Sequence, residues 1–142
     1  MILGVGTIIN VDQLKRTIDI GADFGISPGF ETEIIKYAKE NKFSYIPGIS
    51  TASEIISCLK FDCKFLKLFP AEPLGGISYL NSLSGPFPDI SFCPTGGINS
   101  DNYLSWLSQK NVLCVGGSWI APKNDNNYDK IKKRALEVLK NK

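Results

Sequence analysis

Short apolar runs alternate along this chain with segments in which apolar residues recur every three or four positions. Successive apolar positions are typical of a buried strand, and the wider spacing is typical of one face of a helix. Parallel strands are therefore predicted at residues 2–8, 23–27, 43–48, 64–69, 90–95 and 112–116. Helices are predicted between them, including one that begins after Asn10 and one that opens with the capping-box pair Thr51 and Glu54.

Six strand–helix units in succession predict an α/β fold with a parallel sheet. No linker or low-complexity segment divides the sequence, so residues 1–142 are expected to form one domain. Two architectures fit the pattern about equally well. One is six consecutive units of an incomplete (β/α)8 TIM barrel, a fold that usually needs about 200 residues or more when complete. The other is an open, doubly wound sheet.

Charge and composition limit the classes of binding partner and the residue types that could serve in catalysis. The 16 basic and 14 acidic residues give a net charge of +2, too small to indicate nucleic acid or an anionic membrane as the main partner. No apolar run is long enough to span a bilayer and no signal peptide opens the chain, so a cytoplasmic location is expected. The chain has no histidine and its four cysteines form no C-x-x-C pair, which argues against a metal site. Catalysis would therefore depend on lysine, carboxylates, tyrosine, threonine or backbone groups.

The predicted strands end in glycine, proline or small hydroxyl residues. Ligands of α/β folds gather at the carboxyl ends of the strands. Such residues also simply make turns, but turns alone explain six ends of this kind poorly. The last two ends, "TGG" at 95–97 and "GGS" at 116–118, suit a phosphate group. Glycine lets the backbone approach a ligand closely, and free N–H groups bind anions.

Lys67 lies in the middle of the apolar run "FLKLFPAE". Side chains alternate along a strand, so Phe65, Lys67 and Phe69 share one face while Leu66 and Leu68 share the other. An apolar environment disfavours the ammonium form, lowers the pKa of lysine and makes a neutral amine available to attack a carbonyl group. The alternative is a lysine on an exposed sheet edge that has no chemical role.

The strand ends belong to longer motifs, which read in chain order "GVGTIIN", "GADFGISPG", "YIPGISTASE", "FLKLFPAEPLGG", "SGPFPDISFCPTGGI" and "NVLCVGGSW". Together they resemble the bacterial 2-keto-3-deoxy-6-phosphogluconate aldolases, also called KDPG/KHG aldolases. The resemblance implies a (β/α)8 barrel, usually trimeric, and a metal-independent class I aldolase without a cofactor. It implies that the partners are a phosphorylated keto acid and pyruvate, with glyceraldehyde 3-phosphate as the second product. It also favours the barrel over the open sheet.

The resemblance implies roles for individual residues. Lys67 matches the Schiff-base lysine, and Phe69 matches a pocket residue beside it. Thr7 and Pro28 match residues that line the pyruvate end of the substrate site. The phosphate site is matched by Gly96, Gly97, Gly117 and Ser118.

The sequence departs from the family at its start. The family has two further strand–helix units ahead of "GVGT", which carry a general acid/base glutamate and an arginine that holds the substrate carboxylate. A fragment, a misassigned start or one half of a split protein is therefore expected, with two exposed sheet edges and reduced stability. The only arginines, Arg16 and Arg134, lie in helix patterns. Glu72 lies beyond the strand end and is a poor substitute for the missing base.

Two functions stay open at this point. One is a KDPG-type aldolase that is active, as a homotrimer, when complete. The other is a catalytically impaired fragment or a non-catalytic module for phosphosugar binding or assembly. Other phosphate-binding barrels form a weaker third class, since they share glycine strand ends but need no lysine at position 67. The pattern leaves open the preference among gluconate, galactonate and hydroxyglutarate keto acids.

Overall fold

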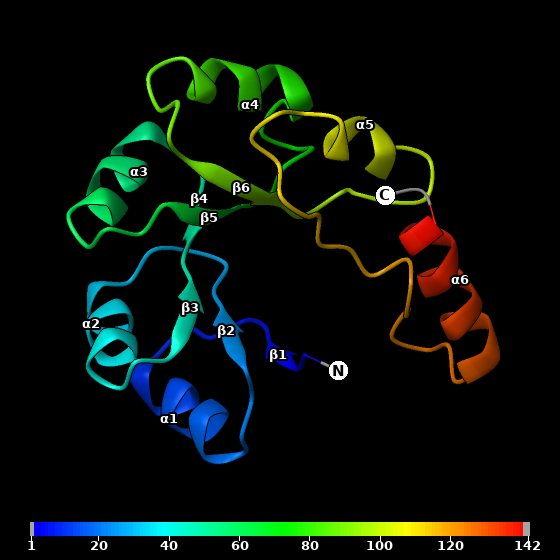
Figure 1. Ribbon diagram of the computed structural model, residues 1–142, viewed down its shortest axis with the longest axis horizontal. Coiled ribbons are helices and arrows are strands. Elements are labelled where there is room, and N and C mark those ends of the chain that lie inside the picture. Colours follow the sequence, from blue (N-terminus) through cyan, green and yellow to red (C-terminus); the bar gives the residue numbers. More distant parts are fainter. Residues whose placement is uncertain (1, 141–142) are drawn as a thin grey trace.

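The computed structural model describes residues 2–140 (Figure 1). Its strands are β1 (Gly4–Val5), β2 (Phe24–Ile26), β3 (Ser44–Ile46), β4 (Gly48–Ile49), β5 (Phe65–Leu68) and β6 (Ser91–Pro94). Its helices are α1 (Val11–Asp19), α2 (Thr32–Glu40), α3 (Ala52–Leu59), α4 (Gly76–Ser84), α5 (Tyr103–Leu107) and α6 (Tyr128–Lys140). Strand regions and helices alternate from β1 to α5, which confirms the predicted α/β class.

The strands form two parallel three-stranded sheets. Their strand orders are β1-β2-β3 and β4-β5-β6, so neighbours in each sheet are also neighbours along the chain. The first sheet lies below the second in Figure 1. A doubly wound sheet reverses its strand order at a switch point, and neither of these sheets contains such a reversal.

Local signals start the helices where the sequence predicts them. The Asn10 side chain accepts a hydrogen bond of 2.9 Å from the Gln13 backbone N–H at the start of α1. At α3, Thr51 and Glu54 form the complete capping box, in which each side chain accepts from the other residue's backbone N–H. These bonds satisfy N–H groups that the first turn of a helix leaves without partners.

The predicted strand at 43–48 is divided between the two sheets. Its first part is β3 and its second part is β4, with Pro47 between them. Proline has no N–H and cannot donate to a ladder. The Pro47 carbonyl still accepts a hydrogen bond of 2.9 Å from the Lys67 backbone N–H, so the two sheets stay joined there. Gly48 then passes so close to Pro28 that a Cβ atom would lie 2.3 Å from the Pro28 carbonyl carbon.

The predicted strand at 112–116 is wrong as a continuous strand. Two isolated parallel bridges take its place, between Phe92 and Val112 and between Thr95 and Gly116. The segment that contains Val112 has one more residue between the bridges than the segment of β6, which is the pattern of a bulge. Pro94 also lacks an N–H for the ladder at this point. The segment therefore follows β6 without forming a regular ladder.

The apolar core consists of two clusters, one for each sheet. The first contains Ile8, Leu14, Ile34 and Ala38, contributed mainly by α1 and α2. The second is larger and joins strands β4 to β6 to α3, α4 and α5. Helix α6 buries no residue completely and reaches the second cluster through the partly buried Val138. No helix within residues 2–140 is both long enough and apolar enough to cross a membrane.

Candidate active site

Lys67 occupies the central strand of the second sheet. It lies between Gly48 of β4 and Cys93 of β6, and only 7% of its surface is exposed. Its neighbours Leu66 and Leu68 are completely buried in the core, as the alternation along the strand predicts. Gly48 presents no side chain to the space beside the lysine. The exposed-edge alternative for Lys67 is therefore wrong.

The electrostatic surroundings of Lys67 favour a neutral amine. No ion pair within residues 2–140 involves this side chain. Burial is the largest effect on this amine, and it lowers the pKa of Lys67. The Nζ atom lies 4.6 Å from the centre of the Phe69 ring, so the structure brings these two predicted site residues together. A buried amine that lacks a carboxylate partner is a candidate nucleophile.

Cys93, the cross-strand neighbour of Lys67, does not provide a base. Its thiol shares a hydrogen bond with the free thiol of Cys114 and is buried, and both effects raise its pKa far above the usual range. The thiol therefore stays protonated near neutral pH and cannot accept a proton readily. Near Lys67 it acts as a small, neutral neighbour.

Thr7 and Pro28 follow the ends of β1 and β2. Thr7 adopts a φ of +62°, which is rare for a β-branched residue and marks a backbone constraint at an exposed position. It lines a groove of about 280 Å³ with Arg16 on the helix side of β1. The backbone of Pro28 packs against Gly48, which is the register partner of Lys67. Pro28 thus lies close to the lysine strand, whereas Thr7 lines the groove beside α1.

The two glycine-rich strand ends lie side by side. Thr95 and Gly116 form a parallel bridge, and a Cβ atom on Gly117 would lie 2.9 Å from the carbonyl oxygen of Ile98. Gly96 and Gly97 have φ values of +98° and +82°, a region that glycine enters without strain. Within residues 2–140, no hydrogen bond uses the N–H groups of Gly97, Gly117 or Ser118. Unpaired N–H groups from two adjacent loops can together bind an anion.

Glu72 forms no ion pair with Lys67 in the described part of the chain. Its Oε1 atom accepts a hydrogen bond of 2.7 Å from Trp106 Nε1 and another of 3.3 Å from Asn102 Nδ2. The carboxylate is therefore bound to α5 and to the loop before it. It cannot act as a base at Lys67, in agreement with the weak prediction for this residue.

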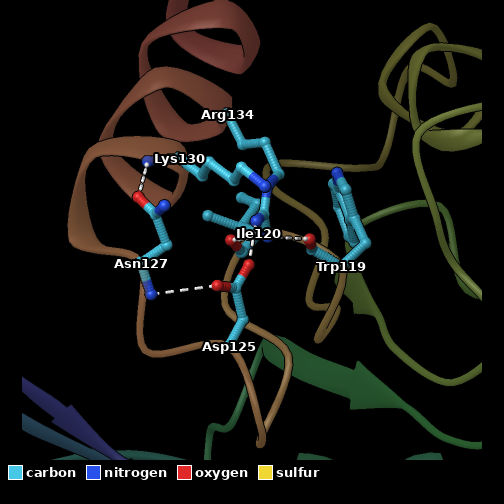
Figure 2. A network of polar contacts seen from close by, with 6 residues as sticks. All are labelled: Trp119, Ile120, Asp125, Asn127, Lys130 and Arg134. Carbon is cyan, nitrogen blue, oxygen red and sulfur yellow. Dashed lines mark hydrogen bonds and ion pairs between the residues drawn. The ribbon is translucent and has the colours of Figure 1, made fainter.

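Arg134 anchors the segment that follows Ser118 to helix α6. Figure 2 shows its guanidinium group among Trp119, Ile120 and Asp125. Its Nη1 atom donates to the carbonyl oxygens of Trp119 at 3.0 Å and Ile120 at 2.7 Å, and its Nη2 atom pairs with Asp125. The hydrogen bond from Arg134 lowers the pKa of Asp125. Because these partners occupy the guanidinium, Arg134 does not offer its charge to a substrate.

Sequence patterns did not reveal the partners of Glu72 and Arg134. These contacts join residues from 9 to 34 positions apart, beyond the range of helix or strand periodicity. The one local signal near them is Asn127, whose side chain accepts from the Lys130 N–H and starts α6. Within residues 2–140, no group of three or more His, Cys, Asp or Glu side chains is arranged to hold a metal ion.

Comparisons with known proteins agree on one family. The family model for KDPG and KHG aldolases matches residues 1–134. The KHG/KDPG aldolase of Escherichia coli K12 is 44% identical over 141 residues, covering 97% of this chain and 66% of that protein. The chain thus spans about two thirds of the length of the curated relatives it matches.

Two solved structures share the fold. A KDPG aldolase from Legionella pneumophila, with pyruvate captured as a covalent carbinolamine intermediate, superimposes with a TM-score of 0.92 at 40% identity, over 96% of this chain and 68% of that one. The 2-keto-3-deoxy-6-phosphogluconate aldolase of Zymomonas mobilis ZM4, with 3-phosphoglycerate, gives a TM-score of 0.89 at 35% identity, over 95% and 64%.

Proposed function

Because this chain belongs to the KDPG and KHG aldolase family, we propose that it carries the Schiff-base half of a class I aldolase site, with Lys67 as the nucleophile. The observation that carries the proposal is the environment of this lysine, which is buried, lacks a carboxylate partner and has a lowered pKa. A relative 40% identical was captured with pyruvate as a covalent carbinolamine, which supports the same chemistry here.

The reaction would proceed through covalent attachment to Lys67. The neutral Nζ attacks the keto carbon of the substrate, and loss of water from the carbinolamine leaves an iminium ion. The iminium accepts the electron pair of the breaking C–C bond while a base takes the proton of the hydroxyl group on the leaving carbon. An aldehyde departs and an enamine remains. Protonation of the enamine and addition of water then release pyruvate and restore the amine. The iminium itself is the electron sink, so this sequence needs no cofactor.

The proposed substrate is 2-keto-3-deoxy-6-phosphogluconate, with pyruvate and glyceraldehyde 3-phosphate as products. Phe69, Pro28 and Thr7 would line the pyruvate end, where Phe69 contacts the lysine and Pro28 packs against its neighbouring strand. Gly96, Gly97, Gly117 and Ser118 would bind the phosphate through backbone N–H groups. The unpaired N–H groups of the last three residues support this assignment within the described part of the chain.

We propose that the six predicted units form part of a (β/α)8 barrel. The parallel strands in chain order and the bond that joins the sheets at Pro47 support this architecture. A homotrimer in the cytoplasm belongs to the same proposal. Further strand–helix units would complete the barrel and cover the edge at β1.

Turnover by these 142 residues alone is proposed to be slow. Cleavage needs a positioned proton acceptor, which is typically worth about 10²–10⁴ in rate. Within residues 2–140, no carboxylate pairs with Lys67, and Glu72 is bound to Trp106. The same observation favours the second candidate, a phosphosugar-binding module without catalysis. Adding a segment with the family's glutamate should restore activity if the aldolase proposal is correct.

Reductive trapping tests the proposal. The protein is incubated with pyruvate and borohydride, and its mass is then measured. We expect one pyruvate adduct on Lys67, no adduct in Lys67→Met, and an unchanged adduct in Lys64→Met, which makes the same substitution at an exposed position next to the strand. An unmodified wild-type chain would contradict the aldolase proposal and favour the binding module. An adduct that survives in Lys67→Met would contradict the lysine assignment.

A further inference from the structure

Glu72 connects the end of the lysine strand to helix α5. Its carboxylate accepts hydrogen bonds from Trp106 Nε1 at 2.7 Å and from Asn102 Nδ2 at 3.3 Å. Trp106 is completely buried, so its indole N–H has a fixed position in the core. A charged acceptor makes the stronger class of hydrogen bond. The orientation of Glu72 is therefore set by the packed part of the second sheet.

Glu72 and Asn102 also hold the Gly96–Gly97 turn in place. The Glu72 backbone N–H donates to the Gly96 carbonyl at 3.0 Å, and Asn102 Nδ2 donates to the Gly97 carbonyl at 3.1 Å. The Cβ of Glu72 fills the space beside Gly97, since a Cβ added to this glycine would lie only 2.5 Å away from it. Backbone bonds and side-chain packing thus restrain the turn from both sides.

We propose that Glu72 is a positioning residue that fixes the Gly96–Gly97 turn relative to Lys67, and that it thereby sets the preference for phosphorylated over unphosphorylated ligands. This inference rests on the proposed function, in which this turn binds the phosphate. A glycine pair has large conformational freedom, and an anion site made of backbone N–H groups is only as good as their alignment. Glu72 removes that freedom, and because it follows Lys67 on one short segment it also fixes the distance between amine and phosphate.

The role of Glu72 depends on its oxygen acceptor rather than its charge. A free carboxylate at this place would repel a phosphate, but this one faces α5 and is bound to two donors. Glu72→Gln keeps an acceptor oxygen for Trp106, whereas Glu72→Ala removes it. If charge were the main effect, Glu72→Gln would bind a phosphorylated ligand more tightly than wild type. If positioning is the main effect, Glu72→Gln should resemble wild type.

The test compares 3-phosphoglycerate with glycerate, which differ by the phosphate, together with pyruvate trapping at Lys67. Dissociation constants are measured by titration calorimetry for wild type, Glu72→Ala, Glu72→Gln and Asn102→Ala. We expect Glu72→Ala to weaken the binding of 3-phosphoglycerate about tenfold, the value of one lost hydrogen bond, and to change glycerate binding and pyruvate trapping less than about twofold. Asn102→Ala should act in the same direction, by about threefold.

Glu54→Ala is the matched control. The Glu54 carboxylate also accepts hydrogen bonds at a helix start, from the N–H groups of Ser50 and Thr51, but it makes no bond to the Gly96–Gly97 turn. The Glu54→Ala variant should be less stable than wild type, but the ratio of its affinities for 3-phosphoglycerate and glycerate should be unchanged. Circular dichroism checks that every variant is folded, and Asn102→Ala provides the measurement if Glu72→Ala does not fold.

The outcomes separate the two levels of inference. Equal weakening of both ligands in Glu72→Ala and Asn102→Ala, with a normal wild type, would overturn the positioning role alone. Tighter 3-phosphoglycerate binding in Glu72→Gln would also overturn it, since that result assigns the effect to charge. A wild-type chain with no pyruvate adduct and no preference for 3-phosphoglycerate would overturn the proposed function, and the role of Glu72 with it.

Discussion

The two sheets differ in the amount of apolar packing that surrounds them. The first sheet, β1 to β3, is packed against a buried cluster of four residues. At its β1 edge, Ile2 is 78% exposed and Leu3 is 47% exposed. The second sheet, β4 to β6, lies in a cluster that includes Leu66, Leu68, Phe92 and Trp106, all completely buried.

This difference shows which sheet can hold a functional group that lowers the stability of the fold. Lys67 is buried without a carboxylate partner, which lowers stability whenever the amine is charged. The large cluster of the second sheet supplies the apolar contacts that offset this cost. The first sheet has a smaller core and instead carries Thr7, which is exposed and has a positive φ. Predictions that act on one sheet at a time can test this division.

The largest effect is expected from cutting into the larger cluster. Leu66→Ala in β5 should lower the free energy of unfolding by about 4 kcal/mol, because it opens a cavity between strands and helices. Leu14→Ala in α1 removes an equally buried leucine from the smaller cluster and should cost about 2–3 kcal/mol. Urea unfolding measures both, with tryptophan fluorescence reporting on the second sheet and circular dichroism on the whole chain. A greater loss in Leu14→Ala would contradict the ranking of the two cores.

Gly97→Val should have the next largest effect. Valine is strained at a φ of +82°, and its Cβ would overlap the Glu72 side chain. We expect a loss of about 2 kcal/mol in the binding free energy of 3-phosphoglycerate, and little change in pyruvate trapping. Gly29→Ala, in the loop between β2 and α2, is the control, because nothing lies within 4 Å of the Cβ position of Gly29. Equal losses for both ligands in Gly97→Val would show that the phosphate site has been misplaced.

Lys67→Met should stabilise the protein while removing the proposed chemistry. The pKa of Lys67 is lower in the folded chain than in the unfolded chain, so the unfolded state binds the proton more readily and the charged amine opposes folding near pH 7. Methionine removes this cost and should raise the free energy of unfolding by about 1 kcal/mol. Lys64→Met, at an exposed position, should change it by less than about 0.5 kcal/mol. A lower free energy of unfolding in Lys67→Met would contradict the inference that the buried amine, without a carboxylate partner, opposes folding.

The smallest expected effect is a displaced pH profile. Formation of the pyruvate adduct should increase with pH as Lys67 loses its proton, with a midpoint below the ordinary lysine value of 10.5 because burial lowers the pKa. In Leu66→Ala the cavity opens on the opposite face of β5, inside the apolar cluster, so the midpoint should stay close to the wild-type value. Trapping measured by mass spectrometry across a pH series gives both midpoints. A wild-type midpoint at or above 10.5 would be inconsistent with the buried amine.

Much of the fold follows from local signals in the sequence. The alternation of strands and helices, the Asn10 cap and the Thr51–Glu54 capping box depend on residues close together in the chain, and all are present. The split at Pro47 and the extra residue near Gly116 were not predicted, because an apolar run does not tell which sheet its parts join. The lengths of the strands depend on these tertiary pairings.

The candidate site divides in the same way. Alternation along β5 correctly predicted that Lys67 lies on the face opposite Leu66 and Leu68, and the apolar surroundings correctly predicted the direction of its pKa shift. The roles of Glu72 and Arg134 in fixing loops depend on partners in other elements. Such contacts appear only when the elements are placed in space, since neither residue stands in a pattern that marks it.

Pro47 also divides the chain for amide hydrogen exchange. Pro47 has no exchangeable amide proton, so the residue at the junction of the two sheets gives no exchange signal. The amides on either side of it report on the cores of the first and second sheets. The Ser27 amide donates a hydrogen bond to the Ile46 carbonyl and should exchange when the first sheet, which has the smaller core, opens. The Lys67 amide is bonded to the Pro47 carbonyl, and its slow exchange would measure how often the strand that carries the nucleophile separates from its neighbour.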